Sequence, residues 1–220
     1  MKAVAQHQFS VESEYLLKNA KRDILSPEEI FRKNHVSRTL VILGSSRCTP
    51  QMEPYMANAR QLAHSVAQWS AKQRPENKLW LVSGGKSGIM EQVSQGALLA
   101  GEKSLGFGFR LESHGVNQHQ DDDFTHLFTD LGIRDYWLYK NSEAIVAFPG
   151  GLGTIMELTD SLLHMQLGMR KKVPMFLFGS KFWNSALNTK LLIQHKVASE
   201  EDLDQIKICD RVEEIICNIM

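Results

Sequence analysis

Two glycine-rich turns in this sequence have the spacing of phosphate-binding loops. In each, an apolar run ends in a glycine pair, and Ile-Met-Glu follows after three residues. We call residues 84–88 the first glycine turn and residues 150–154 the second glycine turn. Glycine lets the backbone turn tightly and approach an anion, and a following helix points its positive end at the same place. This chemistry suits a nucleotide or a sugar phosphate.

The second glycine turn also provides a hydroxyl and a carboxylate. Gly150, Gly151 and Gly153 are followed by Thr154, whose hydroxyl can cap a helix or bind a phosphate oxygen. Thr154-x-x-Glu157 equally matches a capping box, in which the glutamate only satisfies a backbone N–H. A carboxylate one turn inside a phosphate-binding helix would also lie near a bound ribose or an attacking water. Glu157 is therefore a candidate general base, and spacing alone leaves both interpretations open.

The first glycine turn fits neither the P-loop pattern nor the dinucleotide-binding pattern. Gly84 and Gly85 are still expected to bind phosphate, with Glu91 in the position equivalent to Glu157. In the alternative interpretation, Lys86 is solvated, Ser87 only caps a helix and Glu91 is a surface residue.

Arg134 precedes the strand that leads into the second glycine turn. A planar guanidinium provides a fixed grip on a phosphate or a leaving group. The alternative is an ordinary ion pair with Asp130 or Asp135.

Histidine and aspartate residues between 111 and 128 could in principle bind a metal. His114, His119 and Asp121 to Asp123 match no compact metal-site spacing, however, so a long solvated loop is favoured. We expect no metal and no organic cofactor.

The elements that must position these side chains follow from the hydrophobic pattern. Short, fully apolar runs alternate with helical patterns such as residues 53–72, which is typical of a parallel sheet covered on both faces. The fold class is therefore α/β with a doubly wound parallel sheet, whose ligands bind at the carboxyl ends of the strands. The expected strands are residues 39–43, 79–82, 104–109, 144–148 and 173–178.

The two ends of the chain differ from this regular alternation. Residues 1–36 are polar and helix-permissive, and are expected to form an N-terminal extension before a single domain at 37–220. Within the extension, Ser26 and Pro27 match a helix cap followed by a proline at the first helical position. Residues 211–220 match a closing amphipathic helix.

Composition limits the classes of partner and compartment. The 25 basic and 25 acidic residues cancel, so no general field favours nucleic acid or a membrane surface. The three cysteines lie in no disulfide or zinc pattern. With polar first residues and no bilayer-length apolar stretch, we expect a soluble cytoplasmic protein with a small-molecule partner.

Taken together, the motifs resemble those of the LOG ("Lonely guy") family, often labelled lysine decarboxylase-like. The resemblance covers about residues 38 to 215. It includes Gly44-Ser45-Ser46-Arg47, Ser83-Gly84-Gly85-x-x-Gly88-Ile89-Met90-Glu91 and Pro149-Gly150-Gly151-x-Gly153-Thr154-x-x-Glu157. It implies a Rossmann-like, usually dimeric phosphoribohydrolase. Such enzymes cleave the N-glycosidic bond of nucleoside 5′-monophosphates, including cytokinin ribotides, to free base and ribose 5-phosphate.

The resemblance also implies roles for particular residues. Arg134 and Glu157 fall on the family's catalytic positions. Asp135, where the family has lysine, and Leu163, where it has threonine, depart from the pattern, and the usual L-P-x-E-Q loop survives only as Leu111-Glu112. The implied substrate- and phosphate-binding residues are Ser45, Ser46, Arg47, Gly84, Gly85, Gly150, Gly151, Gly153, Thr154, Glu91 and Glu112.

Three functions therefore remain open on the sequence. The first is hydrolysis through an oxocarbenium-like sugar, with Glu157 as the carboxylate and Arg134 at the leaving base. The departures allow a nucleotide-binding sensor or carrier without turnover. A pyridoxal-phosphate decarboxylase is disfavoured because no strand-end lysine stands out. A homodimer is expected through an amphipathic helix bearing Met156, Leu163, Met165, Leu167 and Met169, which could instead be core residues.

Overall fold

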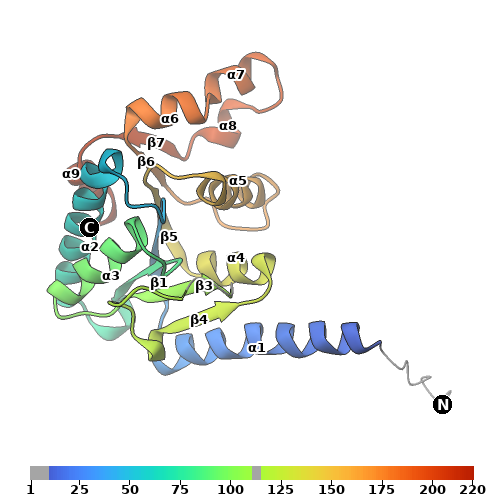
Figure 1. Ribbon diagram of the computed structural model, residues 1–220. Coiled ribbons are helices and arrows are strands. Elements are labelled where there is room, and N and C mark those ends of the chain that lie inside the picture. The colour runs from blue at the N-terminus through green and yellow to red at the C-terminus, as the bar shows by residue number, and fades with distance from the viewer. Residues whose placement is uncertain (1–9, 111–114) are drawn as a thin grey trace.

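The protein folds around one seven-stranded parallel sheet. The computed structural model describes residues 10–110 and 115–220. The strand order is β4-β3-β2-β1-β5-β6-β7, and every neighbouring pair is parallel. Helices cover both faces of the sheet (Figure 1). The expected α/β class with a doubly wound parallel sheet is confirmed.

The strands are β1 (Arg38–Leu43), β2 (Leu79–Ser83), β3 (Leu105–Phe109), β4 (Thr125–Phe128), β5 (Ser142–Ala147), β6 (Met175–Phe178) and β7 (Ile206–Cys209). The helices are α1 (Val11–Lys33), α2 (Glu53–Ser70), α3 (Ile89–Leu99), α4 (Leu131–Tyr139), α5 (Leu152–Gln166), α6 (Ser180–Ala186), α7 (Thr189–Gln194), α8 (Glu200–Leu203) and α9 (Val212–Ile219). In the described part of the chain, no helix combines the length and the apolar character needed to cross a bilayer.

The core has one layer on each side of the sheet. In β1, Val41 and Leu43 belong to one buried cluster, whereas Leu40 and Ile42 belong to the other. This alternation follows from the strand period of two. The first cluster includes residues of α1, α4, α5 and α6, and the second includes residues of α2, α3 and α9. Figure 1 shows α4 and α5 on one side of the sheet, with α2, α3 and α9 on the other.

The helix start predicted at Ser26 and Pro27 is wrong. Helix α1 begins after Ser10, whose hydroxyl accepts a hydrogen bond from the Ser13 N–H, and Pro27 lies inside it. Asp23, Pro27 and Phe31 form the buried face of α1, which packs on β4 and α4. These tertiary contacts outweigh the local cost of an interior proline, as packing commonly does for an amphipathic helix.

Two short strands were not predicted from the sequence. β4 lies within the expected loop 111–128, and β7 lies in the C-terminal region. β4 is the strand at one edge of the sheet and buries only alternate side chains, with His126 and Phe128 facing inward. Its four mixed residues lack the continuous apolar run that marks the central strands.

Candidate active site

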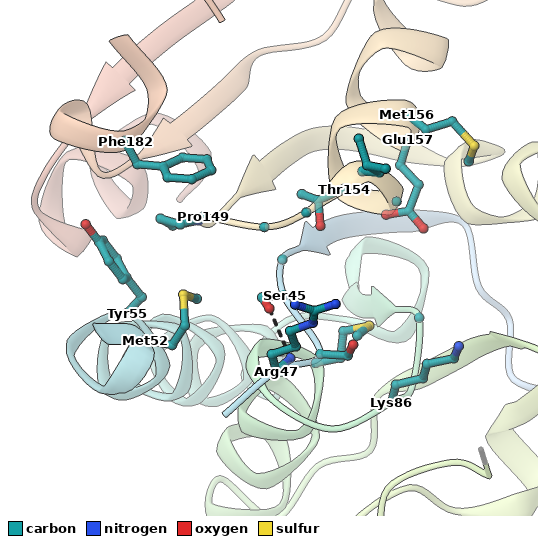
Figure 2. Close-up of a pocket in the computed structure, with 18 of the residues that line it drawn as sticks. Ser45, Arg47, Met52, Tyr55, Lys86, Pro149, Thr154, Met156, Glu157 and Phe182 are labelled. Atoms are coloured by element: carbon teal, nitrogen blue, oxygen red, sulfur yellow. Dashed lines mark hydrogen bonds between the residues drawn. The ribbon is translucent and has the colours of Figure 1, made fainter. Parts of the chain in front are cut away.

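A cleft of about 1220 Å³ opens at the carboxyl ends of the central strands. The turns that follow β1, β2 and β5 meet there, and side chains from α2, α4, α5 and α6 complete the walls. Figure 2 shows the second glycine turn, from Pro149 to Thr154, crossing the middle of this cleft. Ligands of doubly wound sheets bind at this edge.

The turn after β1 fastens the two glycine turns together. The Ser45 N–H donates to the Pro149 carbonyl at 3.1 Å, and the Ser45 carbonyl accepts from the Ile89 N–H at 3.0 Å. The Ser87 hydroxyl donates to the Ser46 carbonyl at 2.7 Å, so Ser87 is not a helix cap. The Arg47 N–H donates to the Ser45 hydroxyl at 3.0 Å, the dashed line in Figure 2. The cleft floor is therefore held by hydrogen bonds among three separate turns.

The second glycine turn leads directly into α5. Gly151 is the N-cap residue, and no side chain caps the helix. The first turn of an uncapped helix leaves N–H groups unpaired, which suits a bound anion. A β-carbon at Gly150 would overlap the Thr154 hydroxyl, so glycine at this position lets the threonine lie against the turn.

The first glycine turn contributes less to the cleft. Gly84 lies so close to Arg134 that a β-carbon there would be 2.9 Å from the arginine Nη2. Gly85, in contrast, does not line the cleft: its N–H donates to the Ser83 hydroxyl, and its carbonyl accepts from the Asn117 N–H. Its φ of +66° favours glycine for the turn itself. The expected phosphate contact from Gly85 is not supported by this geometry.

A buried arginine joins β3 to the carboxylate of α5. The Arg134 Nε donates to the Phe107 carbonyl at 2.7 Å, and its Nη1 donates to Glu157 at 2.5 Å and to Asp135 at 2.9 Å. Arg134 is 6% exposed. Burial alone would lower the pKa of Arg134, but the two carboxylates raise it above its usual value. Asp130 instead caps α4 by accepting from the Ile133 N–H.

Glu157 is held by a side chain rather than by the backbone. Its carboxylate is paired with Arg134, while its own carbonyl accepts from the Tyr139 hydroxyl at 2.8 Å. Because Gly151 is the N-cap and Thr154 makes no capping hydrogen bond, the capping-box interpretation is wrong. The Glu157 side chain is 14% exposed and lines the cleft, so a ligand can reach it.

The neighbouring carboxyl group of Asp135 takes up a proton at a higher pH than an ordinary aspartate does. Burial raises the pKa of Asp135 to about 6, the nearby Arg134 lowers it, and Glu157 and Asp160 raise it further. The guanidinium of Arg134 therefore contacts one carboxyl group, that of Asp135, whose charge changes near pH 6.

Most of the predicted site residues meet in this cleft. The predicted residues that line it are Ser45, Ser46, Arg47, Gly84, Arg134, Gly150, Gly151, Gly153, Thr154 and Glu157. Glu91 does not line it, because α3 turns this side chain toward Gln118 and His119. Glu112, like Leu111 and His114, lies outside the described residues.

Several cleft residues were not identified from the sequence. Tyr55, on α2, and Lys181 and Phe182, on α6, line the wall on the β6 side. No motif marks Tyr55 or Lys181, and the sequence assigns Phe182 no role in binding. A metal is not indicated by the described ranges 10–110 and 115–220, which contain no cluster of three or more His, Cys, Asp or Glu side chains suited to one.

Comparisons with known proteins agree with this architecture. A family model described as "Possible lysine decarboxylase" matches residues 90–219. The cytokinin riboside 5′-monophosphate phosphoribohydrolase LOG7 of Arabidopsis thaliana is 28% identical over 156 residues, covering 70% of this chain and 67% of the relative.

Solved structures show the same fold. A molybdenum cofactor binding protein from Rippkaea orientalis aligns with a TM-score of 0.59 and 22% identity, covering 83% of this chain and 94% of the other. The Moco carrier protein of Chlamydomonas reinhardtii aligns with a TM-score of 0.53 and 18% identity, covering 83% of this chain and 94% of the other.

The family model spans more than half of the chain, and the protein therefore belongs to the family of possible lysine decarboxylases, the LOG family.

Proposed function

We propose that the protein is a nucleoside 5′-monophosphate phosphoribohydrolase, which hydrolyses the N-glycosidic bond to give free base and ribose 5-phosphate. The observation that supports this most strongly is the buried Arg134–Glu157 pair beside the second glycine turn. The turn suits a 5′-phosphate, and the pair lies where the ribose of such a ligand would extend.

The proposed mechanism follows from the charges that develop. Loss of the base leaves an oxocarbenium-like ribose, which a carboxylate near the anomeric carbon stabilises. Glu157 orients a water molecule toward that carbon and accepts its proton. The electron pair of the broken C–N bond moves onto the base, where Arg134 stabilises the developing negative charge. Hydrogen bonds from Arg134 to Phe107 and Asp135 hold the guanidinium in place without the substrate.

The phosphate lies far from the reacting bond in this mechanism. Its interaction with the second glycine turn supplies binding energy that positions the ribose. A nucleoside lacks that anchor and should be a much poorer substrate than its monophosphate.

A nucleotide carrier without turnover is the second candidate. It is favoured by Asp135, which competes with Glu157 for the same guanidinium nitrogen, Arg134 Nη1. A second carboxylate reduces the positive charge available at the leaving base, so binding could persist while hydrolysis is lost.

We also propose that two copies pair through α5. Met156, Leu163, Leu167 and Met169 are exposed on or just beyond this helix, whereas Met165 is buried in the core. Pairing would cover an apolar surface that lies beside the cleft.

One product assay separates the two functions. The protein is incubated with purine and pyrimidine nucleoside monophosphates and with the matching nucleosides, and free base and ribose 5-phosphate are quantified by chromatography. Hydrolysis of at least one monophosphate, with kcat/KM at least about 100-fold above its nucleoside, supports the hydrolase. Binding of the monophosphates without any product favours the carrier.

A further inference from the structure

The cleft extends in two directions from the second glycine turn. In the strand order β3-β2-β1-β5-β6, this turn follows β5, whereas Arg134 binds the carbonyl of Phe107 on β3. At the other end, Tyr55 and Phe182 line the cleft beside β6. Four strand spacings of roughly 4.8 Å separate β3 from β6, so the cleft reaches across about 19 Å of sheet edge. A nucleoside monophosphate with its ribose at Glu157 occupies only the β3 side.

The β6 side, which we call the aromatic end, has rings fixed by the core. Tyr55 lies edge-on to Phe178, with ring centroids 6.4 Å apart. Gly179, with φ +100°, leaves room for that ring, since a β-carbon there would be 2.8 Å from it. Phe182 lies perpendicular to the buried Trp183 at 5.1 Å. Rings held in this way form a preorganised surface on which a flat or apolar group can bind.

Figure 2 shows that the aromatic end lies apart from Glu157. Phe182 and Tyr55 lie to one side of the second glycine turn, beyond Pro149, whereas Glu157 and Met156 lie to the other. Half-buried rings that line a part of the cleft beyond the monophosphate suggest a larger ligand.

Cationic side chains line both parts of the cleft. Arg47 lies below the second glycine turn in Figure 2, and Lys181 precedes Phe182 at the aromatic end. In the described part of the chain, neither Arg47 nor Lys181 forms an ion pair. A second phosphate between the turn and the aromatic end would give these cations a partner.

We propose that the aromatic end is a second binding site for nucleotides of the dinucleotide class, in which a pyrophosphate joins the 5′-nucleotide to a second aromatic group. This inference rests on the proposed function only for the position of the first phosphate, at the second glycine turn. The second phosphate lies toward Lys181, and the second aromatic group lies against Tyr55 and Phe182. Base–aromatic stacking tolerates any flat group, so the site selects for the linkage more than for the base.

The experiment compares AMP with diadenosine 5′,5′-pyrophosphate by isothermal titration calorimetry, with ligand integrity checked by chromatography. Lys181→Met removes an exposed charge at the aromatic end, and Phe182→Leu removes the ring while keeping an apolar side chain. Lys190→Met, an exposed lysine on α7 outside the cleft lining, is the matched control.

We expect the wild-type protein to bind the dinucleotide at least about tenfold more tightly than AMP. Lys181→Met and Phe182→Leu should each remove most of that gain and leave AMP binding within about twofold, and Lys190→Met should change neither ligand. Equal affinities for the two ligands in the wild type, or equal losses for both in the variants, would overturn the proposal. Tight dinucleotide binding without any AMP hydrolysis would contradict the proposed hydrolase and still support the second site.

Discussion

Asp135 is a buried acidic residue in direct contact with Arg134. It occupies a buried position between Arg134 and two other carboxylates, and the pKa of its side chain is raised to about 6. A carboxyl group whose pKa is raised on folding binds its proton more readily in the folded state. The charged form therefore lowers the free energy of unfolding. This destabilisation disappears as the pH falls from about 6 toward about 4, the pKa of the carboxyl group in the unfolded chain.

We predict that Asp135→Asn stabilises the fold at pH 7.5, because the amide cannot carry the buried charge. The expected gain in the free energy of unfolding is about 1–3 kcal/mol, and it should shrink at pH 4.5, where the wild-type carboxyl is largely protonated. Urea denaturation at the two pH values measures this. Destabilisation at pH 7.5 would mean that the ion pair with Arg134 outweighs the burial of the charge.

Gly150 allows a second test of a single residue, the need for glycine beside Thr154. A β-carbon there overlaps the hydroxyl of Thr154, whereas one at Gly153 meets no other atom within 4 Å. We predict that Gly150→Ala lowers the unfolding free energy by about 1–3 kcal/mol through this crowding, and that Gly153→Ala, inside α5, leaves it equal or slightly higher. Equal effects of the two variants on the melting temperature would show that the turn can relax.

The sequence identified the catalytic candidates better than their surroundings. Glu91 and Glu157 occupy the same place in two copies of one motif, yet only Glu157 lines the cleft. Local sequence cannot distinguish them, because the difference depends on Arg134 reaching α5, whereas α3 faces Gln118. Tyr55 and Lys181 escaped notice because contacts between distant elements bring them to the cleft.

At the scale of elements, α1 is attached to the sheet by one buried carboxylate. Asp23 accepts hydrogen bonds from the Thr129 N–H and hydroxyl, both at 2.7 Å, and from His126 Nε2 at 3.0 Å. Burial alone would raise the pKa of Asp23, but these bonds and one from Arg22 lower it to about 2. The stabilisation is therefore present above about pH 4 and is lost as the pH falls toward 2.

We predict that Asp23→Ala lowers the unfolding free energy by about 2–4 kcal/mol, because it leaves the partners in β4 and the following turn unpaired. Glu29→Ala, which breaks only the exposed pair with Arg32 on the same helix, is the control and should change it by less than about 1 kcal/mol. Equal melting temperatures for the two variants would contradict the role assigned to Asp23.

The predictions of strands and helices succeeded where the local sequence alone indicates the element. The central strands were predictable because they are buried on both faces and therefore apolar throughout, as β2 is. The start of α1 was not, because Ser26 and Pro27 match a local helix start, and only the packing of Asp23 and Phe31 on β4 and α4 continues the helix through Pro27. β4 itself depends on pairing with β3, which no local pattern reveals.

At the scale of the whole molecule, the exposed apolar side chains of α5 lead to a prediction about assembly. We expect a homodimer at micromolar concentration by light scattering, and we expect Leu163→Glu to shift it toward the monomer, because a charge there would be buried in the interface. Leu163 is 50% exposed in the single chain, so the substitution should not disturb folding. Leu99→Glu, at a similarly exposed leucine on α3, is the control. A monomeric wild-type protein would defeat the proposal.

In the proposed mechanism, Glu157 acts on the substrate and does not merely complete the fold. Its most direct test is turnover of the best monophosphate by Glu157→Gln, measured together with calorimetric binding and the melting temperature. Glutamine can still accept the hydrogen bond from Arg134, but it cannot stabilise a cationic ribose or accept a proton. We predict a fall in kcat of at least about 100-fold, with nucleotide affinity and melting temperature close to wild type. A Glu157→Gln protein with near wild-type turnover would contradict the mechanism.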